Sequence, residues 1–230
     1  MKQFTGVNDP VFEPNRKKTA LDRFFVKMIR DERDLPFIRL ILRLLLTVIP
    51  SAILMYLHLL PGYWWYLHIV IHLVLLVPNM GPFTLMLHNT SHRPFFKDEY
   101  KWGNGIIPWL LGPFMGQSPF TYFAHHIGMH HSEGNMPDDK SSTMPYKRDT
   151  PSGFFHYWFS FLTIGIVQLV EYFTKKNTKT RRYFQWMSIR GELLFWGFCI
   201  AMCFIDWPTT LMVFIAPILV IRTFMMMGNW

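Results

Sequence analysis

Long apolar runs, separated by short polar or turn-forming breaks, dominate the chain from residue 37 onward. Four runs approach or reach the length of a membrane span: residues 37–60, 63–87, 191–207 and 208–227. A transmembrane helix needs roughly 20 mostly apolar residues. The pattern therefore predicts an all-α integral membrane protein with four transmembrane helices.

Two further apolar stretches are not predicted to cross the membrane. Residues 106–123 contain Pro108, Pro113 and Pro119, and proline interrupts a helix because it lacks an N–H and clashes with the preceding turn. We expect this stretch to lie along the membrane surface. Residues 153–173 are rich in aromatic side chains, and we expect them to form an interfacial helix. A third interfacial helix is expected near residues 21–29.

The charges give an orientation. Lysine and arginine concentrate in residues 1–36, 93–148 and 174–190, whereas the turns at 60–62 and 206–208 contain none. Because cytoplasmic loops carry the excess of basic residues, we predict two helical hairpins with the three basic segments and both termini in the cytoplasm. A span at 153–173 would export the basic residues that follow it.

The amino-acid composition also indicates a membrane protein. Half of the residues are apolar and only 17% are charged, against about 25% in a typical soluble domain. Residues 1–36 are expected to form a cytoplasmic N-terminal tail and residues 37–230 a membrane domain. The net charge of +8 fits basic residues that face anionic headgroups, and no basic patch interleaved with aromatics suggests nucleic-acid binding.

Histidines carry the candidate chemistry. Six of the ten lie in two clusters that follow the second apolar run: His88, His92, His125, His126, His130 and His131. Imidazole is a common ligand of iron, zinc and copper. Residues four apart on a helix share a face, so the sequence predicts metal-binding pairs at His88 with His92 and at His126 with His130. His131 offers a second direction, which suits two adjacent metals.

Two supporting roles stay open. His125 is either a ligand or a partner that supports one, because only His126 stands four residues before His130. Glu133 is the nearest acid, and we expect its carboxylate to orient an imidazole.

A hydrolytic zinc site is the competing interpretation of the two clusters. Neither cluster has the glutamate that a metalloprotease motif places beside its first histidine. An all-histidine cluster favours oxygen-activating iron.

Four histidines remain outside the clusters. His68 and His72 lie in mid-span, more than about 20 Å along a straight helix from His88, and either line a channel or bond to another helix. His58 and His156 are expected at the membrane interface.

The two clusters resemble the histidine boxes of the membrane fatty acid desaturase and hydroxylase superfamily. His88 to His92 is similar to the first box, H-x(3,4)-H, and His126, His130 and His131 are similar to the second, H-x(2,3)-HH. The resemblance implies a site for two irons that activate dioxygen to oxidise an acyl chain. It also implies a membrane lipid or acyl thioester as substrate, and electrons from a b-type cytochrome or ferredoxin.

The resemblance leaves several functions open. The third box of that superfamily, again ending in paired histidines, is missing from residues 132–230. We therefore expect the chain to be an N-terminal portion of a desaturase that is inactive by itself. The alternatives are a lipid hydroxylase of the same superfamily, or a non-catalytic membrane paralogue. The implied location is the endoplasmic reticulum of a eukaryote or the inner membrane of a bacterium.

Overall fold

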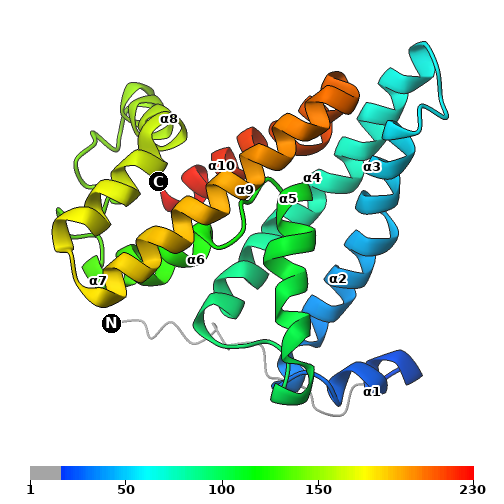
Figure 1. Cartoon of the computed structure of the whole chain (residues 1–230), viewed down its shortest axis with the longest axis horizontal. Coiled ribbons are helices and arrows are strands. Elements are labelled where there is room, and N and C mark those ends of the chain that lie inside the picture. Colours follow the sequence, from blue (N-terminus) through cyan, green and yellow to red (C-terminus); the bar gives the residue numbers. More distant parts are fainter. Residues whose placement is uncertain (1–16) are drawn as a thin grey trace, which may run out of the picture.

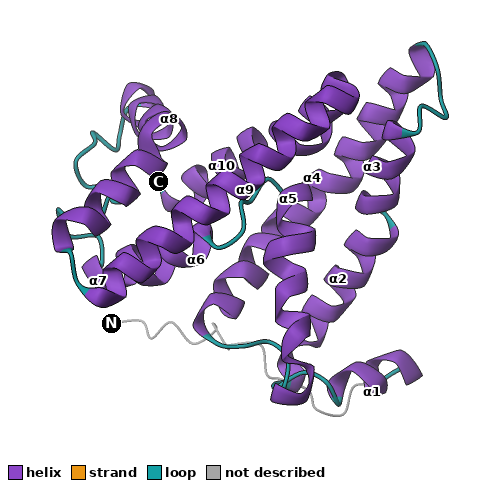
Figure 2. Ribbon diagram, viewed as in Figure 1, coloured by secondary structure: helices purple, strands orange, loops and turns teal. Residues whose placement is uncertain are grey.

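The computed structural model describes residues 17–230, and every regular element in that range is a helix (Figures 1 and 2). The predicted all-α fold is confirmed for these residues. Part of the expected N-terminal tail, residues 1–16, lies outside them. One isolated antiparallel bridge, Ile29 to Phe96, ties the tail to the chain that follows the first histidine pair.

Helix α1 (Ala20–Val26) confirms the helix expected near residues 21–29. The Thr19 side chain accepts a hydrogen bond from the backbone N–H of Asp22, and the Asp22 carboxylate accepts one from the backbone of Thr19. This reciprocal capping satisfies two backbone donors at the helix start. Asp22 also accepts hydrogen bonds from Arg39, which attaches α1 to the first long helical segment.

That segment consists of α2 (Leu35–Leu46) and α3 (Val48–Tyr56), which meet at a non-helical residue, Thr47. Pro50 explains the break, because its ring clashes with the carbonyl four residues earlier and it cannot donate to that group. Helix α4 (Tyr63–His92) then runs back alongside α2 and α3 (Figure 1). The turn before α4 contains Gly62 with a φ of 64°, a conformation that favours glycine.

The proline-containing stretch after α4 is helical and packs more deeply than expected. It comprises η2 (Asp98–Gly105), η3 (Ile106–Leu111) and α5 (Gly112–Phe114), which stand beside α2 in Figure 1. Ile107 and Leu111 are buried in the same apolar core as side chains of α2 and α4. The stretch is therefore part of the helical core.

The C-terminal half contains α8 (Pro151–Lys176), α9 (Lys179–Thr210), η5 (Leu211–Ile215) and α10 (Ala216–Asn229). Helix α9 is interrupted at Asp206, whose φ of −159° and ψ of 94° are extended. This break confirms the turn predicted at residues 206–208. Beyond it η5 packs against α9, and α10 contacts α4 and α8 (Figure 1).

Four helical segments are long and apolar enough to cross a membrane: Glu32–Tyr56, Tyr63–His92, Pro151–Lys176 and Lys179–Asn229. The set differs from the predicted one, because α8 qualifies and the last two apolar runs form one interrupted segment. Length and composition thus permit α8 to span. Its interfacial placement depends on the basic residues after it and stays a prediction.

Candidate metal centre

The first histidine pair stands on the last turn of α4. His88 and His92 are one α-helical turn apart, and their ring centroids are 5.0 Å from each other. The helix ends directly after them because Arg93 is extended, as expected for a residue that precedes proline. Arg93 then pairs with Asp34 at the start of α2. This ion pair fixes the chain as it leaves the histidine pair.

The second cluster has an unexpected backbone. Helix α6 (Thr121–His125) continues into a π-helical turn, η4 (His126–His130), before the short helix α7 (His131–Glu133). A π-turn hydrogen-bonds each residue to the one five positions away. His126 therefore shares a face with His131, and their Nε2 atoms are 3.0 Å apart.

The structure brings His126 closer to His131 than to its predicted partner His130. The ring centroids of His126 and His130 are 5.8 Å apart, against 4.4 Å between His126 and His131. The prediction assumed an α-helix, in which residues four apart are neighbours, whereas the π-turn favours residues five apart. The use of His126 and His130 as a metal-binding pair stays a prediction.

Four imidazoles converge as a result. Ligand atoms of His88, His92 and His126 all lie within 4.8 Å of one another. The Nε2 atoms of His92 and His126 are 3.3 Å apart, and His131 joins the group through His126. Burial, followed by the charges of His88 and His131, lowers the pKa of His126 to about 3. A neutral imidazole keeps the lone pair that a metal requires.

His130 is held separately. Its Nδ1 is 2.7 Å from a carboxylate oxygen of Asp139 and 3.2 Å from the hydroxyl of Ser141. The hydrogen bond to Asp139 raises the pKa of His130. Asp139 is 3% exposed and also accepts from the backbone N–H groups of Asn135 and Ser141. An imidazole fixed through one nitrogen by a carboxylate is typical of a metal ligand whose other nitrogen is free.

Glu133 does not have the role predicted for it. Its carboxylate accepts a hydrogen bond from the hydroxyl of Tyr172 and lies 3.4 Å from Arg181 and 3.6 Å from Lys176. These cations and the tyrosine belong to α8 and α9, so they draw Glu133 away from the imidazoles. Glu133 attaches the second cluster to that helix pair, and Asp139 is the carboxylate that orients a histidine.

Sequence analysis did not identify Asp139, which stands beside a second acid, Asp138, in a polar loop. The signal that separates them is the Ser141-Ser142 pair that follows. An aspartate whose side chain bonds the backbone two residues on forms a compact turn, as Asp139 does with Ser141. Asp138 is instead paired with Lys176 at 2.7 Å.

His125 lies beside the four converging rings. Its ring stacks against His130 with centroids 6.2 Å apart. Its Nε2 is buried and has no hydrogen-bond partner among the described residues. Both open roles for His125, ligand or supporting partner, stay predictions.

The other histidines are placed elsewhere. His68 Nε2 and His72 Nδ1 lie 3.2 and 3.1 Å from the hydroxyl of Ser51, which confirms that they bond to another helix. His58 is 2.7 Å from Asp206, at the opposite end of the helices from the cluster. His156 packs its ring edge against Tyr146.

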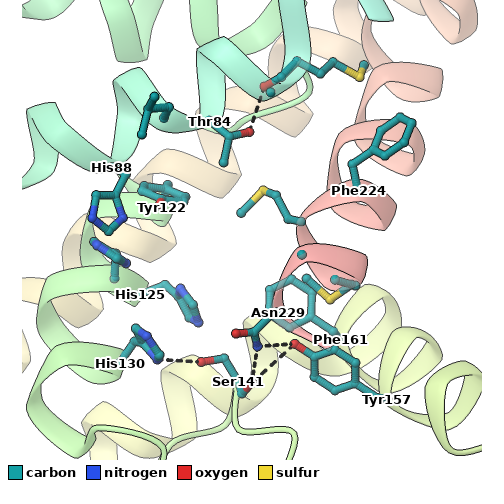
Figure 3. A pocket seen from close by; sticks show the side chains of 17 residues that line it. Thr84, His88, Tyr122, His125, His130, Ser141, Tyr157, Phe161, Phe224 and Asn229 are labelled. Atoms are coloured by element: carbon teal, nitrogen blue, oxygen red, sulfur yellow. Dashed lines mark hydrogen bonds between the residues drawn. The ribbon is translucent and has the colours of Figure 1, made fainter. Parts of the chain in front are cut away.

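A cavity of about 550 Å³ opens beside the cluster (Figure 3). In this view His88, His125 and His130 stand on one side, with Phe224 and Asn229 of α10 across from them. Most of the wall is apolar, including Met80, Leu85, Phe161 and Met225. One corner is polar, where Asn229 donates to the hydroxyl of Tyr157 at 2.8 Å and to the carbonyl of Ser141 at 2.9 Å.

A second cavity of about 490 Å³ meets the cluster at His92. Its wall includes the polar residues Arg93, Asn104 and Ser118. Tyr122 lines both cavities, and its ring stacks on His126 with centroids 5.3 Å apart. The cluster therefore lies between two mostly apolar cavities, each with a few polar groups in its wall.

A helical fold with membrane-length segments, and a cluster of imidazoles that could hold a metal ion beside a mostly apolar cavity, characterises the chain as a membrane protein with a candidate metal site. Comparison with protein families identifies it more closely, because the model of the fatty acid desaturase family matches residues 63–230. The chain belongs to that family. Membership supports a desaturase-type lipid function and oxidoreductase activity in general. Comparisons with curated proteins and with solved structures found no match.

Proposed function

We propose that the protein is a membrane-bound, iron-dependent oxidoreductase that uses dioxygen to introduce a double bond into a lipid acyl chain. One observation carries the proposal: converging imidazoles of His88, His92, His126 and His131 adjoin a mostly apolar cavity. A polar substrate group alone would not require such a wall. A structural metal would not require a cavity.

The donor set fits iron. His88, His92, His126 and His131 would hold it, with His130, and His125 if it is a ligand, at the cavity side. Imidazole suits iron, copper and zinc. Among the described residues, the group of converging ligand atoms includes no carboxylate that could serve as the base of a hydrolytic zinc site. Iron bound there would supply the oxidising power to break an unactivated C–H bond with dioxygen. The family resemblance implies two irons.

The chain's own residues would position the substrate. The apolar side chains of α4, α8 and α10 line the larger cavity and would hold methylene groups in contact with the imidazoles. They would also exclude water, which protects a reactive oxidant from side reactions. Tyr122 packs on His126 and lines both cavities, so it would hold the His126 ring between them.

The membrane arrangement follows from the basic segments. We propose two membrane-inserted hairpins with the histidine cluster on the cytoplasmic side, near lipid headgroups. The substrate would be a membrane lipid or an acyl thioester. A b-type cytochrome or a ferredoxin would deliver electrons from the cytoplasm.

Metal analysis and lipid products test the proposal. The full-length protein that contains this chain would be purified in lipid nanodiscs, loaded with ferrous iron, and supplied with reductant, dioxygen and saturated phospholipid or acyl thioester. We expect a desaturated product, lost in His92→Ala and His130→Ala together with bound iron, but retained in His156→Ala. A hydroxylated product would assign the chain to oxygen insertion. A chain that binds zinc in preference and forms no oxidised lipid would overturn the proposal.

A further inference from the structure

A small cavity lies behind the cluster, on the side of His125 away from the larger cavity. Its volume is about 60 Å³, and α6, α8, α9 and α10 surround it. Two polar atoms in its wall are buried without a hydrogen-bond partner among the described residues, Thr121 Oγ1 and His125 Nε2. Unpaired buried polar atoms cost about 1–3 kcal/mol each, so native proteins satisfy them, often with ordered water.

Two opposite charges line the same cavity. Arg222 on α10 is partly buried, and Glu192 on α9 lines the same space. Within the described residues they form no direct ion pair, although a guanidinium removed from bulk water is stabilised by an opposite charge. Glu192 accepts hydrogen bonds from the hydroxyl of Ser118 and, at 3.0 Å, from the indole N–H of Trp196.

The space suits water. A water molecule requires roughly 10–15 Å³ measured in this way and two to four polar partners. A volume of 60 Å³ therefore accommodates about four molecules, and the wall offers a hydroxyl, an imidazole, a carboxylate and a guanidinium. An anion is disfavoured because Glu192 already balances the charge of Arg222.

We propose that this cavity holds a cluster of water molecules that bridges Arg222 to Glu192 and delivers protons to the histidine cluster. The delivery role rests on the proposed function. Desaturation converts dioxygen, two electrons, two protons and the two hydrogens removed from the acyl chain into two water molecules and a carbon–carbon double bond. The two protons must reach a site whose substrate cavity is mostly apolar.

The contacts outline the route. Ser118 lines the second cavity, together with Arg93 and Asn104, and donates to Glu192. Glu192 faces the small cavity, and so does His125, which also forms part of the wall of the larger one. Glu192 thus links the polar groups of the second cavity to the water cluster, and we assign it as a positioning residue that passes protons onward.

Glu192→Gln tests the proposal, because glutamine keeps the shape and one acceptor but cannot carry the proton. Glu171→Gln is the matched control, since Glu171 is an exposed glutamate that pairs only with Lys175 one turn away. The first readout requires no activity. Infrared difference spectra of the full chain in nanodiscs, recorded on exchange from H₂O to D₂O, should show a carboxylate stretching band that shifts within minutes as its hydrogen-bonded waters exchange, and that disappears in Glu192→Gln alone.

The second readout is the ratio of lipid product to dioxygen consumed. Because positioned proton transfer contributes about 100-fold or more, Glu192→Gln should lower turnover by about 100-fold and release peroxide, with bound iron unchanged. Thr121→Val should reduce turnover less. A carboxylate band that resists exchange for hours, or normal coupling in Glu192→Gln, would overturn the proposal. If the wild type forms no product, the proposed function fails and the infrared result alone decides whether the cavity is hydrated.

Discussion

Replacing Asp139 with asparagine should weaken metal binding without unfolding the protein. The Asp139 carboxylate accepts four hydrogen bonds: from His130, from Asn135 N–H, and from the N–H and hydroxyl of Ser141. Asparagine has one acceptor oxygen, and its amide N–H groups would face donors. His130 would then lose the partner that fixes its orientation.

The expected loss can be sized. Removing the hydrogen-bonded partner of a ligating histidine costs about 10–100-fold in metal affinity, or about 1.4–2.7 kcal/mol. Iron affinity of Asp139→Asn should fall by that factor, measured by competition with a chelator of known affinity in nanodiscs. Asp138→Asn is the control, because Asp138 makes an exposed pair with Lys176, and exposed ion pairs contribute little to stability. Equal affinities of both variants would refute the role given to Asp139.

Three further predictions concern packing, pH and topology. Gly191→Ala should lower the unfolding temperature strongly, because its Cβ would lie 1.8 Å from the carbonyl oxygen of Pro119. Gly197→Ala is the control on the same helix: its Cβ would have no neighbour within 4 Å, so it should be neutral or slightly stabilising. Because the folded pKa of His126 is about 3 against an ordinary 6.5, unfolded chains bind more protons between these values. The metal-free protein should therefore lose stability as pH falls from 6.5 toward 3, less steeply in His126→Gln; equal slopes would contradict this. Lys179→Cys should resist impermeant thiol reagents added outside intact cells, and labelling there would exclude the two-hairpin topology.

Much of the fold was predictable because its signals are local. The apolar runs predicted the long helices, and the Thr19–Asp22 capping pair coincides with the start of α1. Asp206 and Pro208 marked the break in α9. The packing of residues 98–114 against α2 was not predictable. Prolines indicate where a helix is interrupted, but they do not indicate which other helix packs against it. Placement of α8 depends on a membrane that no local pattern specifies.

The site was predictable in its residue types but not in its pairing. Histidine spacing identified the two clusters, and the α4 pair has the expected geometry. Which carboxylate supports a histidine depended on tertiary contacts: Glu133 is captured by Tyr172 and Arg181, and Asp139 is buried by its own loop. Glu192 and Arg222 lie far from the clusters in sequence and meet them only through the packing of α9 and α10.

The π-turn of the second cluster would couple metal binding to the hydrogen-bonding pattern of the backbone. With α-helical hydrogen bonds, the same residues would bring His126 and His130 together and turn His131 aside. A cation held by both His126 and His131 would therefore stabilise the π-turn over the α-helical turn, by the ratio of its affinities for the two conformations. Removal of that cation would then favour the α-helical turn. A sequence motif identifies the histidines that are available as ligands. The hydrogen-bonding pattern of the helix then determines which of these histidines lie on the same face.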